Sequence, residues 1–201
     1  MALKGIDTAP AILRAALTDQ EERELLARIA DKREQSAFRE LYGIYYQRLT
    51  RLLTRMSMRR EDIEEIINDT FWVVWTKASE FRGASQLSTW IIGIAYRRAL
   101  NTLRRDRLRP VGSEPVTEDM MSTPSSATAE EHAQWIHYGL EKLPLEQRLA
   151  LELTYTLGHS CEEIASILSC PVNTVKTRLF RARETLKQVL PALAGESGDR
   201  K

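Results

Sequence analysis

The C-terminal part of the chain carries a basic stretch that also repeats apolar residues at helical spacing. Val175, Leu179, Ala182 and Leu186 are separated by steps of four, three and four, so they share one face of a helix. Off that face lie five cationic side chains, with Glu184 the only acid between them: Lys176, Arg178, Arg181, Arg183 and Lys187. Such side chains bind phosphate and donate hydrogen bonds to guanine. The stretch is therefore either a solvated surface helix or a nucleic-acid-binding helix.

The residues before this stretch favour nucleic-acid binding. Ser160 followed three residues later by Glu163 predicts a capping box at the start of a short helix. Pro171 then separates that helix from the next, because the residue before a proline is pushed out of the helical conformation. A short helix, a tight turn and a longer basic helix follow the order of a helix-turn-helix, whose second helix enters the DNA major groove. The predicted base-contacting residues point away from the apolar face: Asn173, Thr174, Lys176, Thr177, Phe180 and Arg181.

Two stretches in the N-terminal half carry charges of opposite sign. Residues 61–75 (EDIEEIINDTFWVVW) are acidic and rich in tryptophan, which suits a protein partner because large aromatic side chains dominate interface energies. We expect Trp75 in the core, since it lies near the apolar stripe of this segment, whereas Trp72 lies further round and its position stays open. Residues 82–109 carry seven arginines against one acid, Asp106, and suit nucleic-acid phosphate.

The periodicity of the chain predicts an all-α fold. Helical patterns recur in both halves, and no alternating strand pattern is longer than a few residues. Thr18 and Glu21 predict a capping box at the first helix, and residues 108–129, with three prolines among many Ser and Thr, have linker composition. We therefore predict two small helical domains joined by a flexible linker. We predict a disordered extension at residues 1–17, the first domain at residues 18–107 and the linker at residues 108–129. The second domain follows at residues 130–190, and a tail at residues 191–201.

The length, the composition and the net charge of the chain exclude several classes of protein. The 201 residues have 43% hydrophobic content and a net charge of only +1, so the chain can bury a core and is not a polycation. With two cysteines, and with neither a signal-peptide pattern nor a long apolar run, it is expected to be soluble and intracellular. His159, Cys161 and Cys170 have poor spacing for zinc, so we expect no metal site. No catalytic arrangement of side chains is evident, which predicts a protein that is not an enzyme and needs no cofactor.

Four segments resemble, in order, regions 2 and 4 of the sigma factors of the extracytoplasmic-function (ECF) subfamily, over residues 36–107 and 139–190. They are SAFRELYGIYYQRL, EEIINDTFWVVW, FRGASQLSTWIIGIAYRRALNTLRR and LEKLPLEQRLALELTYTLGHSCEEIASILSCPVNTVKTRLFRARETL. The resemblance implies a subunit that binds core RNA polymerase, recognises the −35 and −10 promoter elements and helps to open the duplex. It also implies a cytoplasmic protein that an anti-sigma factor holds inactive, often at the inner face of the membrane.

The resemblance implies three binding surfaces. The helix that contains EEIINDTFWVVW docks on core RNA polymerase, with these candidates: Glu65, Asp69, Phe71 and Trp72. The loop that contains FRGASQLST holds a base flipped out of the −10 element, near Arg82, Ser85 and Gln86. The next helix faces the opening −10 DNA through four residues: Trp90, Arg97, Arg98 and Asn101. The basic helix of the helix-turn-helix reads the −35 duplex. Primary sigma factors carry two adjacent tryptophans where this chain has Trp90 and Ile91, which implies weaker unaided strand opening.

The linker length fits simultaneous binding to both promoter elements. Roughly 16 to 17 base pairs separate the elements by about 55 Å, and about twenty extended residues reach roughly 65–70 Å. A stand-alone helix-turn-helix regulator that binds duplex DNA as a dimer is the alternative, but the arginine-rich first domain has no part in that function. A sigma mimic that only occupies a partner protein is disfavoured by the intact basic helix.

Overall fold

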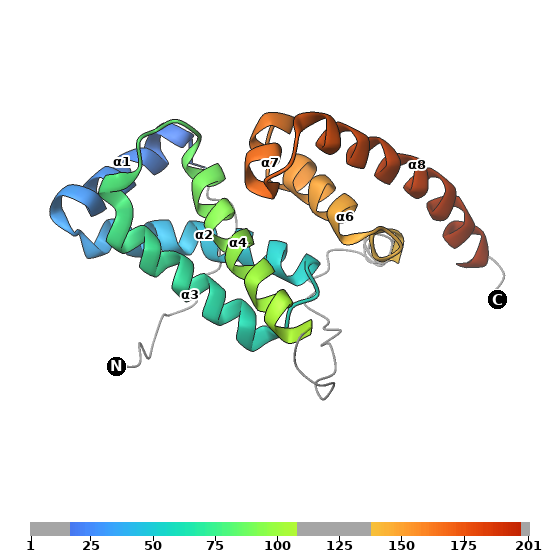
Figure 1. Cartoon of the computed structure of the whole chain (residues 1–201), viewed down its shortest axis with the longest axis horizontal. Coiled ribbons are helices and arrows are strands. Elements are labelled where there is room, and N and C mark those ends of the chain that lie inside the picture. Colours follow the sequence, from blue (N-terminus) through green and yellow to red (C-terminus); the bar gives the residue numbers. More distant parts are fainter. Residues whose placement is uncertain (1–16, 108–137, 198–201) are drawn as a thin grey trace.

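A computed structural model describes residues 17–107 and 138–197, which form helices joined by short turns (Figure 1). The first unit consists of α1 (Asp19–Lys32), α2 (Gln35–Arg55), α3 (Arg60–Lys77), the 3₁₀ turn η1 (Ala78–Glu80) and α4 (Leu87–Arg107). The second unit consists of α6 (Leu145–Leu151), the π-helical η2 (Glu152–Thr156), α7 (Cys161–Leu168) and α8 (Val172–Ser197). The residues in these ranges form no strand, and the all-α prediction is confirmed.

Several predicted segments lie outside the described residues. These are the N-terminal extension up to residue 16, the linker at residues 108–129, the start of the second domain up to residue 137, and residues 198–201 of the tail. α8 continues to Ser197, past residue 190, where the second domain was predicted to end. Over the ranges that the structure describes, no helix combines the length and the apolar character needed to cross a membrane.

α1 begins where the sequence predicts it, after Thr18. The N–H of Glu21 donates to Oγ1 of Thr18 over 3.3 Å, and the N–H of Thr18 donates to Oε2 of Glu21 over 2.8 Å, so the predicted capping box is confirmed. The hydrogen bonds from Thr18, its backbone N–H foremost, favour the ionised carboxylate and lower the pKa of Glu21. The helix ends at Arg33, whose left-handed backbone (φ 49°) turns the chain into α2.

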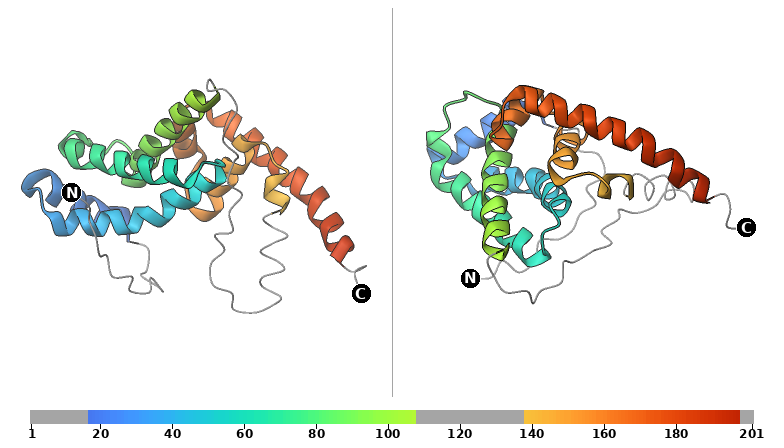
Figure 2. Two further views of the ribbon diagram at one scale, coloured as in Figure 1. Left: turned by 90° about the horizontal axis from the view of Figure 1, so that it is seen from below. Right: turned by 45° about the vertical axis from the view of Figure 1, so that its right-hand side comes forward.

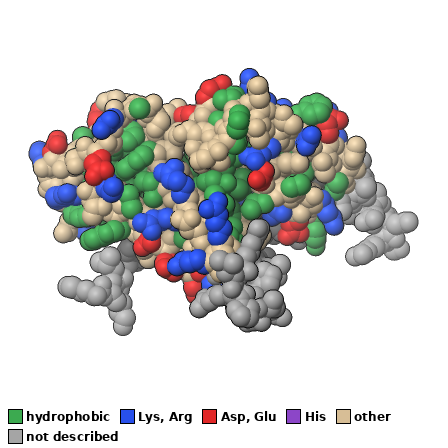
Figure 3. Space-filling view, in the orientation of Figure 1, with side chains coloured by type: hydrophobic (Ala, Val, Ile, Leu, Met, Phe, Trp, Pro, Cys, Tyr) green, Lys and Arg blue, Asp and Glu red, His purple; other side chains and the backbone are tan. Residues whose placement is uncertain are grey.

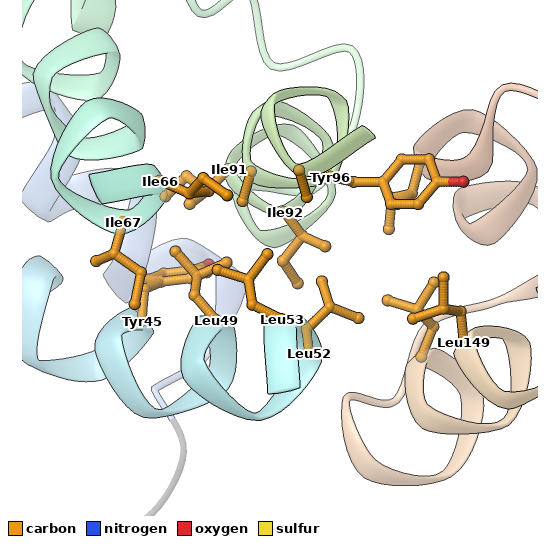
Figure 4. Packing of buried hydrophobic residues seen from close by; sticks show 14 of the residues in the cluster. Tyr45, Leu49, Leu52, Leu53, Ile66, Ile67, Ile91, Ile92, Tyr96 and Leu149 are labelled. Atoms are coloured by element: carbon orange, nitrogen blue, oxygen red, sulfur yellow. The ribbon is translucent and has the colours of Figure 1, made fainter. Parts of the chain in front are cut away.

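The core of the first unit lies between the apolar faces of α2, α3 and α4. Buried residues recur at helical spacing along α2 and α3: Leu41, Tyr45, Leu49, Leu52, Ile66, Ile67 and Phe71. In Figure 4, Ile91 and Ile92 of α4 join the same cluster. Trp75, which was expected in the core, is half-buried at its edge, with its ring edge-on to Phe38 and the two centroids 5.1 Å apart.

The second unit is a helix-turn-helix supported by α6. The N–H of Glu163 donates to Oγ of Ser160 over 3.2 Å, and the N–H of Ser160 donates to Oε2 of Glu163 over 2.8 Å, which confirms the predicted capping box of α7. α7 stops at Ser169, whose backbone is left-handed (φ 52°), and Pro171 directly precedes α8. The core of this unit comes from all its helices: Leu149, Leu153, Ile164, Ile167, Leu168, Val175, Leu179 and Ala182.

The two units pack directly against each other, a contact that the sequence does not predict. α4 lies on α7 and α2 lies against α6, while α8 extends away from this contact (Figures 1 and 2). Figure 4 shows Leu52 and Tyr96 reaching from the first unit toward Leu149 of the second, so that one hydrophobic cluster spans both. The apolar pattern of α4 predicts a buried face, but it does not say which helix covers that face.

Polar contacts join the two units around this apolar interface. Oγ1 of Thr89 in α4 donates to Oε1 of Glu163 in α7 over 3.2 Å. Nε of Arg55 lies 3.5 Å from Oε2 of the buried Glu152, and Nη1 of Arg148 donates to the carbonyl of Arg55 over 3.5 Å. The interface therefore combines an apolar centre with a rim of hydrogen bonds and an ion pair.

Candidate nucleic-acid and polymerase interfaces

α8 buries one face and exposes the residues predicted to contact bases. Val175 and Leu179 are buried, and they seat α8 on the rest of the second unit. Five of the six predicted residues on the opposite face are exposed to solvent: Asn173, Lys176, Thr177, Phe180 and Arg181. The sixth, Thr174, is half-buried. Phe180 is 63% exposed, and an aromatic ring held in water here is suited to contact with a thymine methyl group. This is the arrangement that a major-groove helix requires.

Two other cations of α8 have structural partners. The guanidinium of Arg178 pairs with the carboxylate of Glu146 in α6. Nε of Arg183 donates to the hydroxyl of Tyr155 over 2.8 Å, and its guanidinium stands 5.7 Å from the centroid of that ring. These two arginines hold α8 against its own unit. The outward cations of the predicted base-contacting set form no ion pair with any residue that the structure describes.

The loop of residues 82–86 joins η1 to α4 and exposes two of its three predicted site residues. Arg82 and Gln86 are exposed, whereas Ser85 is half-buried, with its hydroxyl donating to the carbonyl of Gln86 over 3.2 Å. Gly83 has a left-handed φ of 71°, a conformation that favours glycine. The loop therefore presents a cation and an amide to solvent from a backbone with a fixed turn.

Trp90, the single tryptophan of the predicted opening surface, stands at the start of α4. It is half-buried, and its ring centroid lies 5.3 Å from that of Phe81 at the end of η1. The next residue, Ile91, is fully buried in the core of the first unit. Of the two positions that carry paired tryptophans in primary sigma factors, only Trp90 reaches the surface here.

Further along α4, the predicted −10 surface adjoins the predicted polymerase surface. Arg97 and Asn101 are exposed, whereas Arg98 is half-buried and pairs with Asp69 of α3. Figure 3 shows Lys and Arg side chains gathered over the lower part of α4. Both side chains of this ion pair keep contact with solvent, so it contributes at most about 1 kcal/mol and a binding partner can displace it at little cost.

The outer face of α3 carries three of the four residues predicted to bind the polymerase. Glu65 is exposed, Asp69 is half-buried, and Trp72 is 66% exposed. Phe71, in contrast, is 1% exposed and packs against Phe38 at a centroid distance of 5.8 Å. The structure therefore places Phe71 beneath this surface, in the core, and its side chain cannot face a partner. The period of the helix explains the difference, because adjacent residues point in directions about 100° apart.

Two residues of α1 adjoin the loop and were not predicted from the sequence. Oδ1 of Asp19 accepts the N–H of Leu87 over 2.8 Å, and Nη2 of Arg23 donates to the carbonyl of Ser85 over 2.7 Å. In the sequence they form only an opposite-charge pair at i and i+4, a pattern that is common on helices and does not indicate a distant partner.

A cavity of about 490 Å³ opens between the two units, beside the loop. Both units line it, with residues that include Arg48, Gln86, Tyr155 and Leu157. Its lining mixes charged, polar and apolar side chains. Within residues 17–107 and 138–197, no group of three or more His, Cys, Asp or Glu side chains is arranged to hold a metal ion.

Both units match families of known proteins. The family described as Sigma-70 region 2 matches residues 41–109, and that described as Sigma-70, region 4 matches residues 133–186. The RNA polymerase sigma-H factor of Pseudomonas aeruginosa is 30% identical over 195 residues, which cover 90% of this chain and 100% of that protein. The ECF RNA polymerase sigma-E factor of Haemophilus influenzae is 31% identical over 189 residues, which cover 88% of this chain and 97% of that protein.

Solved structures show the same fold. CnrH, in complex with the cytosolic domain of CnrY, aligns with a TM-score of 0.60 and 24% identity over 85% of this chain and 97% of that chain. The sigma factor RpoE from Bartonella quintana, in complex with the anti-sigma factor NepR, aligns with a TM-score of 0.59 and 22% identity over 77% of this chain and 96% of that chain.

These observations together define a helical protein with a helix-turn-helix in one unit and a second basic surface in the other. The chain belongs to the extracytoplasmic-function subfamily of the sigma-70 family. It is an alternative sigma factor, which directs promoter-specific initiation of transcription by RNA polymerase. The stand-alone regulator considered from the sequence is not favoured.

Proposed function

We propose that this sigma factor divides promoter recognition among three surfaces. Glu65, Asp69 and Trp72 on α3 dock on core RNA polymerase. The loop and the exposed face of α4 bind the melted −10 element through Arg82, Ser85, Gln86, Trp90, Arg97, Arg98 and Asn101. The outward face of α8 reads the −35 duplex through Asn173, Thr174, Lys176, Thr177, Phe180 and Arg181. One observation carries the proposal: α8 exposes five of the six side chains predicted to contact bases, while its opposite face is buried.

The polymerase surface is proposed from the exposure of Trp72. An indole that is 66% exposed leaves a large apolar area in water, and burial of such a ring against a partner is strongly favourable. Glu65 gives this surface a negative charge, to which Asp69 adds when a partner displaces Arg98. The surface therefore suits a basic partner face with an apolar pocket.

Strand opening is proposed to depend on Trp90 and on the loop. Taking a base out of the DNA stack is unfavourable, so aromatic contact and cationic groups must offset the loss of stacking. Trp90 is the one aromatic wedge that this part of α4 offers at the surface, because Ile91 is fully buried. We therefore expect efficient initiation only at promoters whose −35 and −10 elements are close to ideal.

The two units are proposed to separate on the promoter. The −35 and −10 elements lie roughly 55 Å apart along the duplex, whereas α4 and α7 are in direct contact here. Separation breaks the hydrogen bond between Thr89 and Glu163 and exposes apolar residues such as Tyr96. Polymerase and DNA contacts must offset this loss.

An anti-sigma factor is proposed as the partner that keeps the units together. CnrH and RpoE of Bartonella quintana, which share this fold, were solved in complex with CnrY and with the anti-sigma factor NepR. The cavity between the units supports such a partner here, since residues of both units line it. We propose that the chain acts as a non-catalytic subunit in the cytoplasm, where this partner controls its access to the polymerase.

Reconstituted transcription tests the proposed function. Core polymerase with the purified chain is supplied with a library of randomised promoters, and the transcripts are sequenced. We expect initiation at templates with two conserved elements separated by about 17 base pairs, which core polymerase alone does not use. Initiation without such a pair, or binding of the chain alone to a palindromic duplex, contradicts the proposal and favours a dimeric regulator.

A further inference from the structure

One arginine of α1 holds the loop of residues 82–86 in place. Nη2 of Arg23 donates to the carbonyl of Ser85 over 2.7 Å, and Nη1 donates to the carbonyl of Gly83 over 3.5 Å. A single guanidinium thus bridges two carbonyls of the loop, as its planar fork allows. The charge of Arg23 is paired with Asp19, so the guanidinium is not presented for phosphate contact.

Asp19 fixes the far end of the same loop. Its Oδ1 accepts the N–H of Leu87 over 2.8 Å, one of the amide groups that the first turn of α4 leaves without a helical partner. Its Oδ2 accepts from Nε of Arg23 over 2.5 Å. Hydrogen bonds between charged groups are the stronger kind, so the two side chains orient each other while each binds the loop. We call this pair the α1 clamp.

Gly83 fits the α1 clamp closely. Its φ is 71°, and a Cβ atom at this position would lie 2.8 Å from Nη1 of Arg23. A side chain here would strain the backbone and displace the guanidinium. The same guanidinium stands 5.4 Å from the ring centroid of Phe81, which in turn contacts Trp90. Contacts therefore run from α1, through the loop, to the aromatic residue proposed to face the opening strand.

We propose that Asp19 and Arg23 are positioning residues for −10 recognition. They hold the loop backbone in the shape that presents Arg82 and Gln86 to the unpaired base. This inference rests on the proposed function of the loop. Recognition of one base by hydrogen bonds requires groups held to within about 0.5 Å, and a loop lacks the repeating backbone hydrogen bonds that give a helix this precision. The α1 clamp supplies that precision from a neighbouring helix.

The test compares Arg23→Gln with Arg28→Gln in holoenzyme assembled from the full chain and core polymerase. Arg28 is a matched control, because it lies near the other end of α1 and pairs with Glu34. Base preference is measured by sequencing transcripts from promoters randomised in the −10 element. We expect Arg23→Gln to reduce the preference at one −10 position by about tenfold, as for the loss of a strong hydrogen bond, and Arg28→Gln to leave it unchanged.

A purely structural role gives a different result. If Arg23 had a purely structural role, Arg23→Gln would lower the thermal midpoint of unfolding and reduce transcription from all −10 sequences alike. Unchanged base preference in this variant overturns the inference. Asp19→Asn keeps the shape of its side chain and supplies the same test if Arg23→Gln does not fold. Gly83→Ala disturbs the α1 clamp from the loop side and is expected to repeat the altered preference.

A variant of the loop separates this inference from the proposed function. Arg82→Ala removes a side chain that the proposal places against the base. Altered preference in Arg82→Ala but not in Arg23→Gln overturns only the role of the α1 clamp. If neither variant alters the preference, the loop does not read the −10 element and the proposed function of this surface fails as well.

Discussion

The two proposed DNA-reading surfaces differ in how they are held in shape. On α8, the exposed residues keep their spacing because a helix repeats its own backbone hydrogen bonds, and the nearby Arg178 and Arg183 only anchor the helix to its unit. The loop of residues 82–86 has no such repeat. Its shape depends on Asp19 and Arg23, which lie 60 to 68 positions before the residues they bind.

This difference teaches where remote contacts are needed. A helix that reads duplex DNA carries its geometry in its own sequence, so a local motif suffices. A loop that receives a single flipped base needs side chains from other elements to fix its backbone. Within α3 the contrast is one of exposure: Trp72 is open to a partner, and its neighbour Phe71 is fixed in the core.

The largest expected effect distinguishes the buried side of α3 from its exposed side. Phe71→Ala removes a buried ring and should lower the free energy of unfolding by about 3–5 kcal/mol. Trp72→Ala should change that free energy by less than about 0.5 kcal/mol, because its ring already meets solvent. Urea unfolding measures both. Equal losses of stability in the two variants would contradict the division of α3 into a core side and a binding side.

The next effect concerns polymerase binding by the exposed side of α3. Trp72→Ala should weaken the affinity for core RNA polymerase by about 2 kcal/mol or more, since large aromatic residues dominate protein interfaces. Fluorescence titration of labelled protein with core enzyme measures the affinity. Gln35→Ala, at the exposed start of α2, is the control that should leave it unchanged. Unchanged binding in Trp72→Ala would remove α3 from the polymerase interface.

A pair of variants sharpens the distinction among the cations of α8. Lys176→Ala should weaken binding to a selected −35 duplex by about 1–3 kcal/mol and relax the base preference at one position. Arg183→Ala should leave base preference unchanged, because Arg183 contacts Tyr155. Fluorescence anisotropy with single-base variants of the duplex measures both. If Arg183→Ala alone relaxes the preference, the outward residues of α8 are wrongly assigned.

Matched capping variants compare the stability of the two units. Thr18→Ala and Ser160→Ala each remove the side-chain acceptor of a capping box, and each should cost about 1 kcal/mol in the free energy of unfolding. Hydrogen exchange should locate the loss at the start of α1 in the first variant and at the start of α7 in the second. Loss of protection throughout the chain in either variant would show that a single cap supports more than its own helix.

The smallest effect is a pH dependence that originates in the second unit. His159 is buried, neither ring nitrogen has a hydrogen-bond partner among the described residues, and Nδ1 lies 3.8 Å from Oε2 of Glu163. Burial lowers the pKa of His159, more than the attraction of Glu163 raises it. The unfolded chain therefore takes up a proton at higher pH than the folded chain. The neutral His159 ring therefore leaves the free energy of unfolding at its full value above about pH 6.5, and this free energy declines as the pH falls below that value.

The substitution His159→Leu tests this dependence. It should flatten the decline in urea midpoint between about pH 7.5 and about pH 5.5, and it should be close to neutral at the higher pH because no hydrogen bond is lost. A decline of the same size in the variant would place the pH dependence in other groups.

The sequence predicted those features that depend on near neighbours in the chain. Thr18 with Glu21, and Ser160 with Glu163, are pairs three residues apart, and both capping boxes form as predicted. The buried face of α8 likewise follows from the spacing of Val175 and Leu179.

Features that depend on packing between distant segments could not be predicted in this way. The ion pair of Asp69 with Arg98, the contact of α4 with α7 and the α1 clamp all join residues whose spacing carries no period. Phe71 illustrates the limit within one helix. A resemblance placed it at a partner surface, whereas the position of α2 decides that it is buried.

The carboxylate of Glu163 serves two neighbours with its two oxygens. Oε2 accepts the N–H of Ser160 and so caps α7, while Oε1 accepts the hydroxyl of Thr89 across the interface. Departure of the first unit frees only Oε1, which water can then solvate, and the cap inside the helix-turn-helix is left intact. Because the two oxygens serve different neighbours, the proposed separation of the units would leave the N-cap of α7 in place.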